Sequence, residues 1–205
     1  MTQSLVAEAL AVPPVVPICG LGDPSAQFLV YIDKRPSFSG LALTNQVQAL
    51  SRGEIHAIGQ ACGNGWRKVF NLYAKLIFAL GNEPFSVDHQ NEPFPVDRQS
   101  QTWQQYREQT LLQPSSNTAL LFSEPSLKQD KKLHVVMGRS YAKSLTFPSS
   151  LTWLDNEFAL APAERLIVCP YFDYRQLSNI KLIRLVTLIG DINREITSPS
   201  PIKLA

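Results

Sequence analysis

The sequence predicts an α/β fold in which helices pack around a mainly parallel sheet. Four short runs have the length and the β-branched or apolar composition of strands, at residues 27–32, 118–122, 133–138 and 165–169. Segments with helical spacing separate or follow these runs, and strands that alternate with helices form layered sheets with parallel strands. No shift in composition divides the 205 residues, so we expect one domain over residues 1–205.

Helical periodicity is weak over residues 44–59 and strong after Asn64, the expected N-cap. Apolar residues recur there at spacings of three and four: Trp66, Val69, Phe70, Tyr73, Leu76, Ile77 and Leu80. Further helices are predicted over residues 99–112, in the short segment 139–145, and over 178–196, where an apolar stripe faces the core.

The segment at residues 82–99 is a tandem repeat, NEPFSVDHQ followed by NEPFPVDRQ, with seven of nine positions identical. Lengthening a surface loop changes stability little, so a duplication of this size is best tolerated there. We interpret the repeat as a loop insertion, with a two-unit binding segment as the alternative.

Composition excludes several classes of protein. The net charge of +2 is too small to identify a nucleic-acid binder, and no apolar run approaches the ~18 residues of a membrane helix. The first residues carry a glutamate within an apolar stretch and no preceding basic residue, which is unlike a secretory signal and favours a cytoplasmic location. Cys19, Cys62 and Cys169 are widely separated, so we expect reduced thiols rather than disulfides.

The loop PYFDYRQLS, residues 170–178, is the main candidate site because it joins the last predicted strand to the last helix. Its candidate ligand-binding residues are Tyr171, Phe172, Asp173, Tyr174, Arg175, Gln176 and Ser178. Aromatic rings, a planar guanidinium and several hydrogen-bonding groups suit a planar, polar, phosphorylated ligand. The alternative is a structural role, with a serine cap, core aromatics and a local ion pair.

Two aspartates are candidate catalytic residues, Asp23 in GLGDPS and Asp33 in IDKRPS. A carboxylate at the end of a strand can orient water as a general base, although many such aspartates only cap a turn. Arg35 and Arg139 follow predicted strands and are further candidate ligand-binding residues.

Asn64 and Trp66 are also candidate ligand-binding residues, since they stand at a helix entry whose backbone amides could bind phosphate. Cys62 lies just before this helix and permits a third hypothesis, a hydrolase with a cysteine nucleophile. The three histidines fall in separate elements without metal-ligand spacing, so neither a metal nor a cofactor is predicted.

Three segments, TALLFSEPSL, HVVMGRSYAKSL and LIVCPYFDYRQLS, each combine a predicted strand with the loop that follows it, and GNGWRKVFNLYAKL is a predicted helix. The three segments resemble successive strand-and-loop units of the uracil-DNA glycosylase superfamily, and the helix resembles one beside the pocket of that family. The resemblance implies a three-layer sandwich around a short, mainly parallel, four-stranded sheet. It also implies that Leu177 corresponds to the residue that wedges into a duplex, and Ser178 to a phosphate contact. The family's histidine is missing from residues 170–178.

The sequence thus predicts a cytoplasmic α/β protein of bacterial type that binds nucleic acid or a nucleotide through strand-end loops. Any enzymatic activity would be at most a vestigial hydrolysis of N-glycosidic bonds, and whether the protein is an enzyme stays open. The alternative is a non-enzymatic module that binds a ligand or a protein through the loop from Tyr171 to Ser178. No membrane partner is expected, and the oligomeric state stays open.

Overall fold

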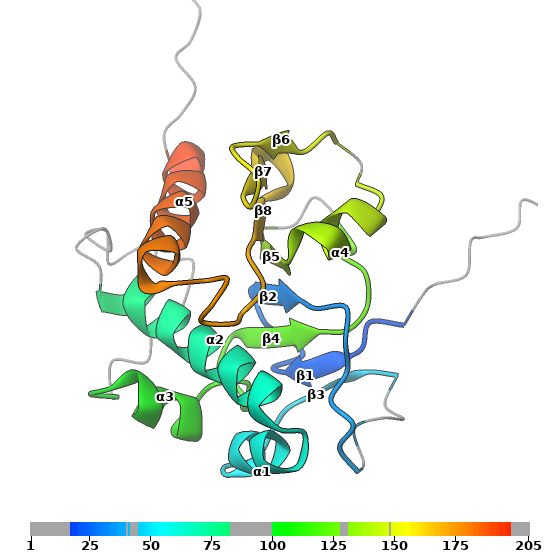
Figure 1. Cartoon of the computed structure of the whole chain (residues 1–205), viewed down its shortest axis with the longest axis vertical. Helices are drawn as coiled ribbons and strands as arrows, with labels where there is room; N and C mark the ends of the chain where they lie inside the picture. The colour runs from blue at the N-terminus through cyan, green and yellow to red at the C-terminus, as the bar shows by residue number, and fades with distance from the viewer. Residues whose placement is uncertain are drawn as a thin grey trace, which may run out of the picture.

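The fold is known from a computed structural model, which describes residues 17–39, 41, 45–82, 100–127, 131–147 and 149–197. These residues form one sheet and several helices (Figure 1). The strands are β1 (Gly20–Gly22), β2 (Phe28–Tyr31), β3 (Val47–Gln48), β4 (Thr118–Leu121), β5 (Leu133–Met137), β6 (Thr152–Trp153), β7 (Ala159–Ala161) and β8 (Leu166–Cys169). The helices are α1 (Glu54–Ala61), α2 (Asn64–Asn82), α3 (Trp103–Gln109), α4 (Arg139–Ser144) and α5 (Asn179–Thr197), with a 3-10 turn at Pro162–Glu164.

The centre of the sheet is the set of four parallel strands that the sequence predicts. β4, β2, β5 and β8 lie side by side in this order and run in the same direction. Every residue of these four strands is buried. A parallel strand that is covered on both faces reads as a continuous apolar run, and this is why the four strands are visible in the sequence.

The predicted fold class is wrong in the size and the strand directions of the sheet. The sheet has eight strands, in the order β3-β1-β4-β2-β5-β8-β7-β6, rather than four. It is mixed, because β1 pairs antiparallel with β4 at one side, and β7 and β6 add antiparallel pairs at the other. The four outer strands have only two or three residues each, too few for a recognisable pattern. The glycosylase-like architecture of the resemblance is therefore not observed.

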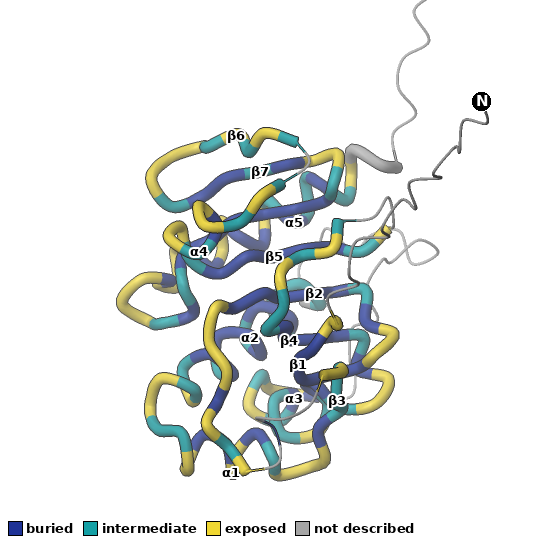
Figure 2. The backbone as a smooth tube through the Cα atoms, turned by 90° about the vertical axis from the view of Figure 1, so that its right-hand side faces the viewer, coloured by how far each residue is buried: buried dark blue, intermediate teal, exposed yellow. Residues whose placement is uncertain are grey.

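The two layers of helices are unequal, which also departs from the predicted three-layer sandwich. One face of the sheet packs against α1, α2, α3 and α5 in a single apolar core (Figure 1). The other face carries Leu29, Tyr31 and Val136, and the described helix packed on it is the short α4, through Ala142. Figure 2 looks onto this second face, with the strands in front of α2 and α3.

Tyr73 of α2 fixes the larger helical layer to the sheet. It is fully buried, and its hydroxyl lies 3.2 Å from the carbonyl oxygen of Phe28 and 3.1 Å from that of Ala119. These two carbonyls belong to the neighbouring strands β2 and β4, so a single phenol donates to the backbone of both.

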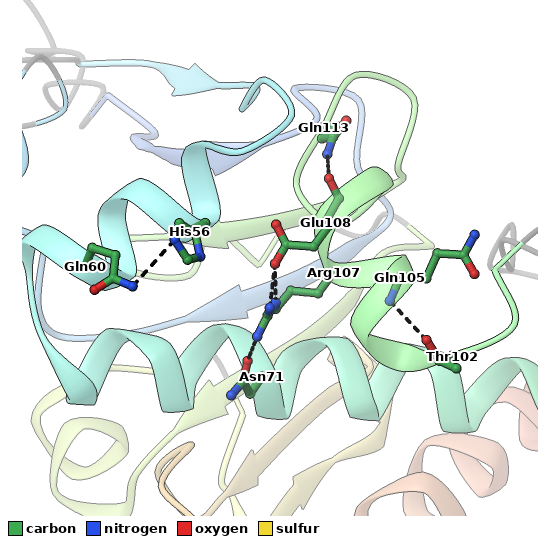
Figure 3. A network of polar contacts seen from close by, with 8 residues as sticks. All are labelled: His56, Gln60, Asn71, Thr102, Gln105, Arg107, Glu108 and Gln113. Atoms are coloured by element: carbon green, nitrogen blue, oxygen red, sulfur yellow. Dashed lines mark hydrogen bonds and ion pairs between the residues drawn. The ribbon is translucent and has the colours of Figure 1, made fainter.

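Polar contacts join α3 to α2 at the outside of this layer (Figure 3). Arg107 donates to the side-chain oxygen of Asn71, and its Nε donates to Glu108 at 2.8 Å. Thr102 caps α3, since its hydroxyl oxygen accepts the N–H of Gln105 at 3.2 Å. This network is a structural link between two helices.

The predicted helices are confirmed in part. α2 begins at Asn64 and α5 at Asn179, close to the predicted starts, whereas α3 is shorter than the predicted segment 99–112. The prediction over residues 44–59 is wrong in its first half, where Val47–Gln48 forms β3. Residues 83–99, with most of the repeat, lie outside the described residues. None of the helices in the described part of the chain is long and apolar enough to cross a membrane.

Two glycine substitutions should change stability in opposite directions. Gly22 in β1 has φ +124°, and an alanine Cβ there would lie 2.3 Å from the carbonyl oxygen of Thr118. Gly22→Ala should therefore destabilise the fold by about 3 kcal/mol, from strain and backbone displacement. Gly190→Ala in α5 meets no neighbouring atom within 4 Å and should stabilise the fold by up to about 1 kcal/mol through helix propensity.

Urea unfolding, monitored by circular dichroism, measures the free energy of unfolding of each variant. A change of the same sign in the two variants would contradict the described environment of one of the glycines.

Candidate functional site

The carboxyl ends of β2, β4, β5 and β8 meet at one edge of the sheet, because these strands are parallel and in register. We call the first residues of the segments that follow these strands the carboxyl edge; among them are Asp33, Phe122, Glu124, Arg139, Tyr141 and Tyr171. Ligands of α/β proteins commonly bind outside this end of the strands. The carboxyl edge is therefore the first place to look for a site.

Asp33 lies near two half-buried phenols at this edge. Burial raises the pKa of Tyr171, and the negative charge of Asp33 raises it further. Burial also raises the pKa of Tyr141 to about 12, with added contributions from Glu124 and Asp33. Both phenols keep their proton at neutral pH, so each can donate a hydrogen bond beside an exposed carboxylate.

Arg35 brings a guanidinium to the same edge. Its Nη2 donates to the sulfur of the buried Cys19 at 2.7 Å, and its central carbon lies 5.8 Å from the centre of the Phe122 ring. Arg35 is exposed, and a guanidinium has five N–H donors, so donors remain for a ligand.

The N-terminus of α2 lies beside these residues. Trp66, in the first turn of α2, packs edge-on against Phe122 with the ring centres 6.3 Å apart. The N–H groups of a first helical turn have no partners within the helix and favour an anion. Asn64, the first residue of α2, is exposed.

The apolar part of the loop at residues 170–178 serves the core. Phe172 is fully buried and packs edge-on against Tyr73 at 6.2 Å between ring centres. Leu177 is also fully buried, so it is not at the surface where the resemblance would need a wedge. Two side chains of the loop thus anchor it to α2 and to the sheet.

The polar part of the loop is divided between anchoring contacts and exposed groups. Asp173 forms an ion pair with Lys68 at 2.6 Å, and this hydrogen bond holds the pKa of Asp173 below its usual value. The ring of Tyr174 lies 5.0 Å from the ammonium of Lys75. Arg175, Gln176 and Ser178 are exposed.

Asp23 lies at the opposite end of the sheet. β1 runs antiparallel to β4, so the residue after β1 stands beside the amino end of β4. Its carboxylate accepts hydrogen bonds from the N–H and hydroxyl of Ser25, at 2.8 and 2.6 Å, and from the N–H of Asn117 at 3.2 Å. The two candidate aspartates therefore do not share a site, and only Asp33 faces the carboxyl edge.

Arg139 and Cys62 are less suited to the roles proposed from sequence. Arg139 is directed to the turn between β6 and β7, where it donates to Asn156 at 3.0 and 3.1 Å and lies 5.2 Å from the Trp153 ring centre. Burial raises the pKa of the Cys62 thiol, which opposes its use as a nucleophile.

Sequence reasoning missed three residues of the carboxyl edge. Phe122 and Glu124 follow a correctly predicted strand, so the rule that selected Asp33 would have found them. Tyr141 lies in the short helix α4 just beyond β5, and nothing in its local sequence distinguishes it from a core tyrosine.

Comparison with known proteins gives one match. A family model described as "Family of unknown function (DUF6942)" matches residues 19–190. No curated protein and no solved structure matches the chain. Nothing in these findings links the chain to the uracil-DNA glycosylase superfamily, so that resemblance stays an untested prediction.

The position of Asp33 can be checked by titration of the two phenols. Asp33→Asn removes a negative charge that disfavours the phenolate, so the pKa of Tyr171 and that of Tyr141 should both fall. NMR of ¹³C-labelled tyrosine rings across the alkaline range reports each phenol separately. Asp155→Asn, which removes a carboxylate from the β6–β7 turn, should leave both pKa values unchanged; equal effects of the two variants would refute the arrangement.

Proposed function

We propose that this chain, which belongs to the family of unknown function (DUF6942), binds a nucleotide at the carboxyl edge of its sheet. The observation that carries the proposal is that Asp33, Tyr141 and Tyr171 follow β2, β5 and β8, which are adjacent parallel strands whose carboxyl ends lie at one edge of the sheet. A convergent set of polar groups at this edge is the usual form of a small-molecule site in an α/β fold.

The chemistry of these groups matches the parts of a nucleotide. The carboxylate of Asp33 accepts hydrogen bonds from ribose hydroxyls or from an exocyclic amino group of a base. The protonated phenols of Tyr141 and Tyr171 donate to carbonyl or phosphoryl oxygens, and neither carries a charge that would repel a phosphate. Each hydrogen bond to a charged group contributes about 1.5–3 kcal/mol.

Two further features favour a phosphate and a base. The guanidinium of Arg35 is a planar donor suited to phosphate oxygens, and the first turn of α2 adds backbone N–H groups. Phe122 and Trp66 are half-buried, so part of each ring remains accessible for stacking against a base. Asn64 would lie next to the phosphate in this arrangement.

The loop from Tyr171 to Ser178 has a smaller role than the sequence suggests. Its aromatic and acidic groups are largely engaged with α2, which leaves Tyr171 as its main contribution to the ligand. A nucleotide-binding module needs no catalysis, so binding alone would satisfy the proposal. The cytoplasmic location expected from the sequence belongs to the same proposal.

Hydrolysis of an N-glycosidic bond is the second candidate function, favoured by the position of Asp33 beside two proton donors. In that reaction Asp33 would take a proton from water while the water oxygen bonds to the anomeric carbon. The bond to the base would break, and a phenol would supply the proton that the leaving base needs. Release of free base from nucleosides, lost in Asp33→Asn, would support this activity over binding alone.

Calorimetric titration with adenosine 5′-monophosphate tests the proposed binding. Arg35→Ala should weaken the affinity about tenfold or more, because one charge-assisted contact to phosphate is lost. Adenosine and ribose 5-phosphate should each bind more weakly than the nucleotide, since adenosine lacks the phosphate and ribose 5-phosphate lacks the base.

Arg52→Ala is the matched control. Arg52 is exposed and follows β3. Because β3 is parallel to β1, and β1 is antiparallel to β4, β3 ends at the opposite side of the sheet from the carboxyl edge. Its removal should leave the affinity unchanged. If the nucleotide does not bind at all, or if the two arginine variants lose affinity equally, the carboxyl edge is not a nucleotide site.

A further inference from the structure

A strip of cationic and aromatic side chains runs along the outer face of α2, beyond the carboxyl edge. α2 packs one face into the core, and its outer face carries Asn64, Lys68, Asn71 and Lys75 at spacings of four, three and four. α3 lies on one side of this face, and the loop that leads into α5 lies on the other (Figure 1). We define the α2 strip as these four residues and six that flank them: Trp103, Arg107, Glu108, Asp173, Tyr174 and Arg175.

Direct contacts hold both flanks of the strip to α2. Lys75 lies between two rings, since its ammonium is 5.0 Å from the ring centre of Trp103 on α3 and 5.0 Å from that of Tyr174 in the loop. Closer to the N-terminus of α2, Lys68 forms its ion pair with Asp173 of the same loop at 2.6 Å. The members of the strip are therefore neighbours in space and share one surface.

The strip is positively charged. It has four cations and two carboxylates, so its net charge equals the +2 of the whole chain. Each carboxylate is already paired, one with Lys68 and the other with Arg107, which also donates to Asn71 (Figure 3). Lys75 and Arg175 form no ion pair with any carboxylate among the described residues. These two cations remain for an anionic partner.

Aromatic rings stand between the cations. The side chain of Tyr174 is 40% exposed, and Trp103 is half-buried. Proteins that bind single-stranded nucleic acid combine these two elements, with cations that follow the phosphates and aromatic rings on which bases stack. A base in a duplex is already stacked and paired, so a ring such as that of Tyr174 favours a single strand.

The length of the strip exceeds a single nucleotide. From Asn64 to Lys75 the helical rise gives about 16 Å. A stacked strand carries one phosphate about every 3.4 Å, so this length faces about five phosphates. The strip begins at Asn64, where the phosphate of the nucleotide proposed above would lie.

We propose that the α2 strip binds single-stranded nucleic acid, whose end nucleotide occupies the carboxyl edge. The inference rests on the proposed function for the position of this end nucleotide. Lys75 and Arg175 contact phosphates of the following nucleotides, and a base stacks on Tyr174. Phosphates and base faces are common to DNA and RNA, so the strip accepts both.

Fluorescence anisotropy with labelled oligonucleotides tests the strip. The probes are an oligodeoxyadenylate and an oligoadenylate of about eight nucleotides, a length within the usual range for such sites. Both should bind at least about tenfold more tightly than adenosine 5′-monophosphate, because they add phosphate and base contacts. A duplex of the same deoxyadenylate with its complement should bind at least about tenfold more weakly than the single strand. Equal affinity for duplex and single strand would overturn the proposal.

Removal of a cation from the strip should weaken oligomer binding and its dependence on salt. Lys75→Gln and Arg175→Ala should each reduce the affinity about threefold or more and reduce the slope of log K against log salt by about 0.7. Lys143→Gln is the matched control, because this exposed lysine also lies near a tryptophan ring, 6.0 Å from the centre of Trp153, but on the opposite face of the sheet. A salt slope that falls equally in all three variants would contradict the assigned position.

The ring of Tyr174 is tested separately from its hydroxyl. Tyr174→Ala should weaken the binding of both single strands about fivefold or more, since a stacked base loses its platform. Tyr174→Phe keeps the ring and should retain the affinity. Full affinity in Tyr174→Ala, or an equal loss in both variants, would refute the stacking contact.

The strip and the nucleotide site can fail independently. Lys75→Gln, Arg175→Ala and Tyr174→Ala should leave the binding of adenosine 5′-monophosphate unchanged, because these residues lie outside the carboxyl edge. If the mononucleotide binds but the oligomers bind no more tightly, the strip is not a nucleic-acid site and the proposed function stands. If neither Arg35→Ala nor the mononucleotide affects oligomer binding, the end nucleotide does not occupy the carboxyl edge.

Discussion

The pairing of β2 with both of its neighbours is the interaction on which the rest of the structure depends. Phe28 to Tyr31 pair in parallel with β4 on one side and with β5 on the other, in matching registers. Because side chains alternate along a strand, this strand contributes Phe28 and Val30 to one core and Leu29 and Tyr31 to the other. A slip of one residue would exchange these sets and would also shift Asp33 by one position relative to the ends of β4 and β5.

The same pairing explains how much of the fold the sequence predicts. The four central strands and the two long helices have strong periodicity, since each buries a whole face or stripe. The outer strands depend on contacts with a strand already in place: β1 has glycine at two of its three positions, and its Gly20 has room for no side chain against β4. Such a segment carries no local β signal. Tertiary pairing, not propensity, makes it a strand.

The candidate site, like the fold, could be predicted only in part from the sequence. The rule that functional groups follow parallel strands selects Asp33, Arg35 and Tyr171 from sequence alone, because it needs only the strand ends. It does not separate Asp33 from Asp23, since the direction of β1 is not visible in three residues. It also overestimates the loop after β8, where Phe172 and Leu177 are core residues and Asp173 pairs with a lysine on α2. Those partners lie about a hundred positions away in the chain, beyond the reach of local patterns.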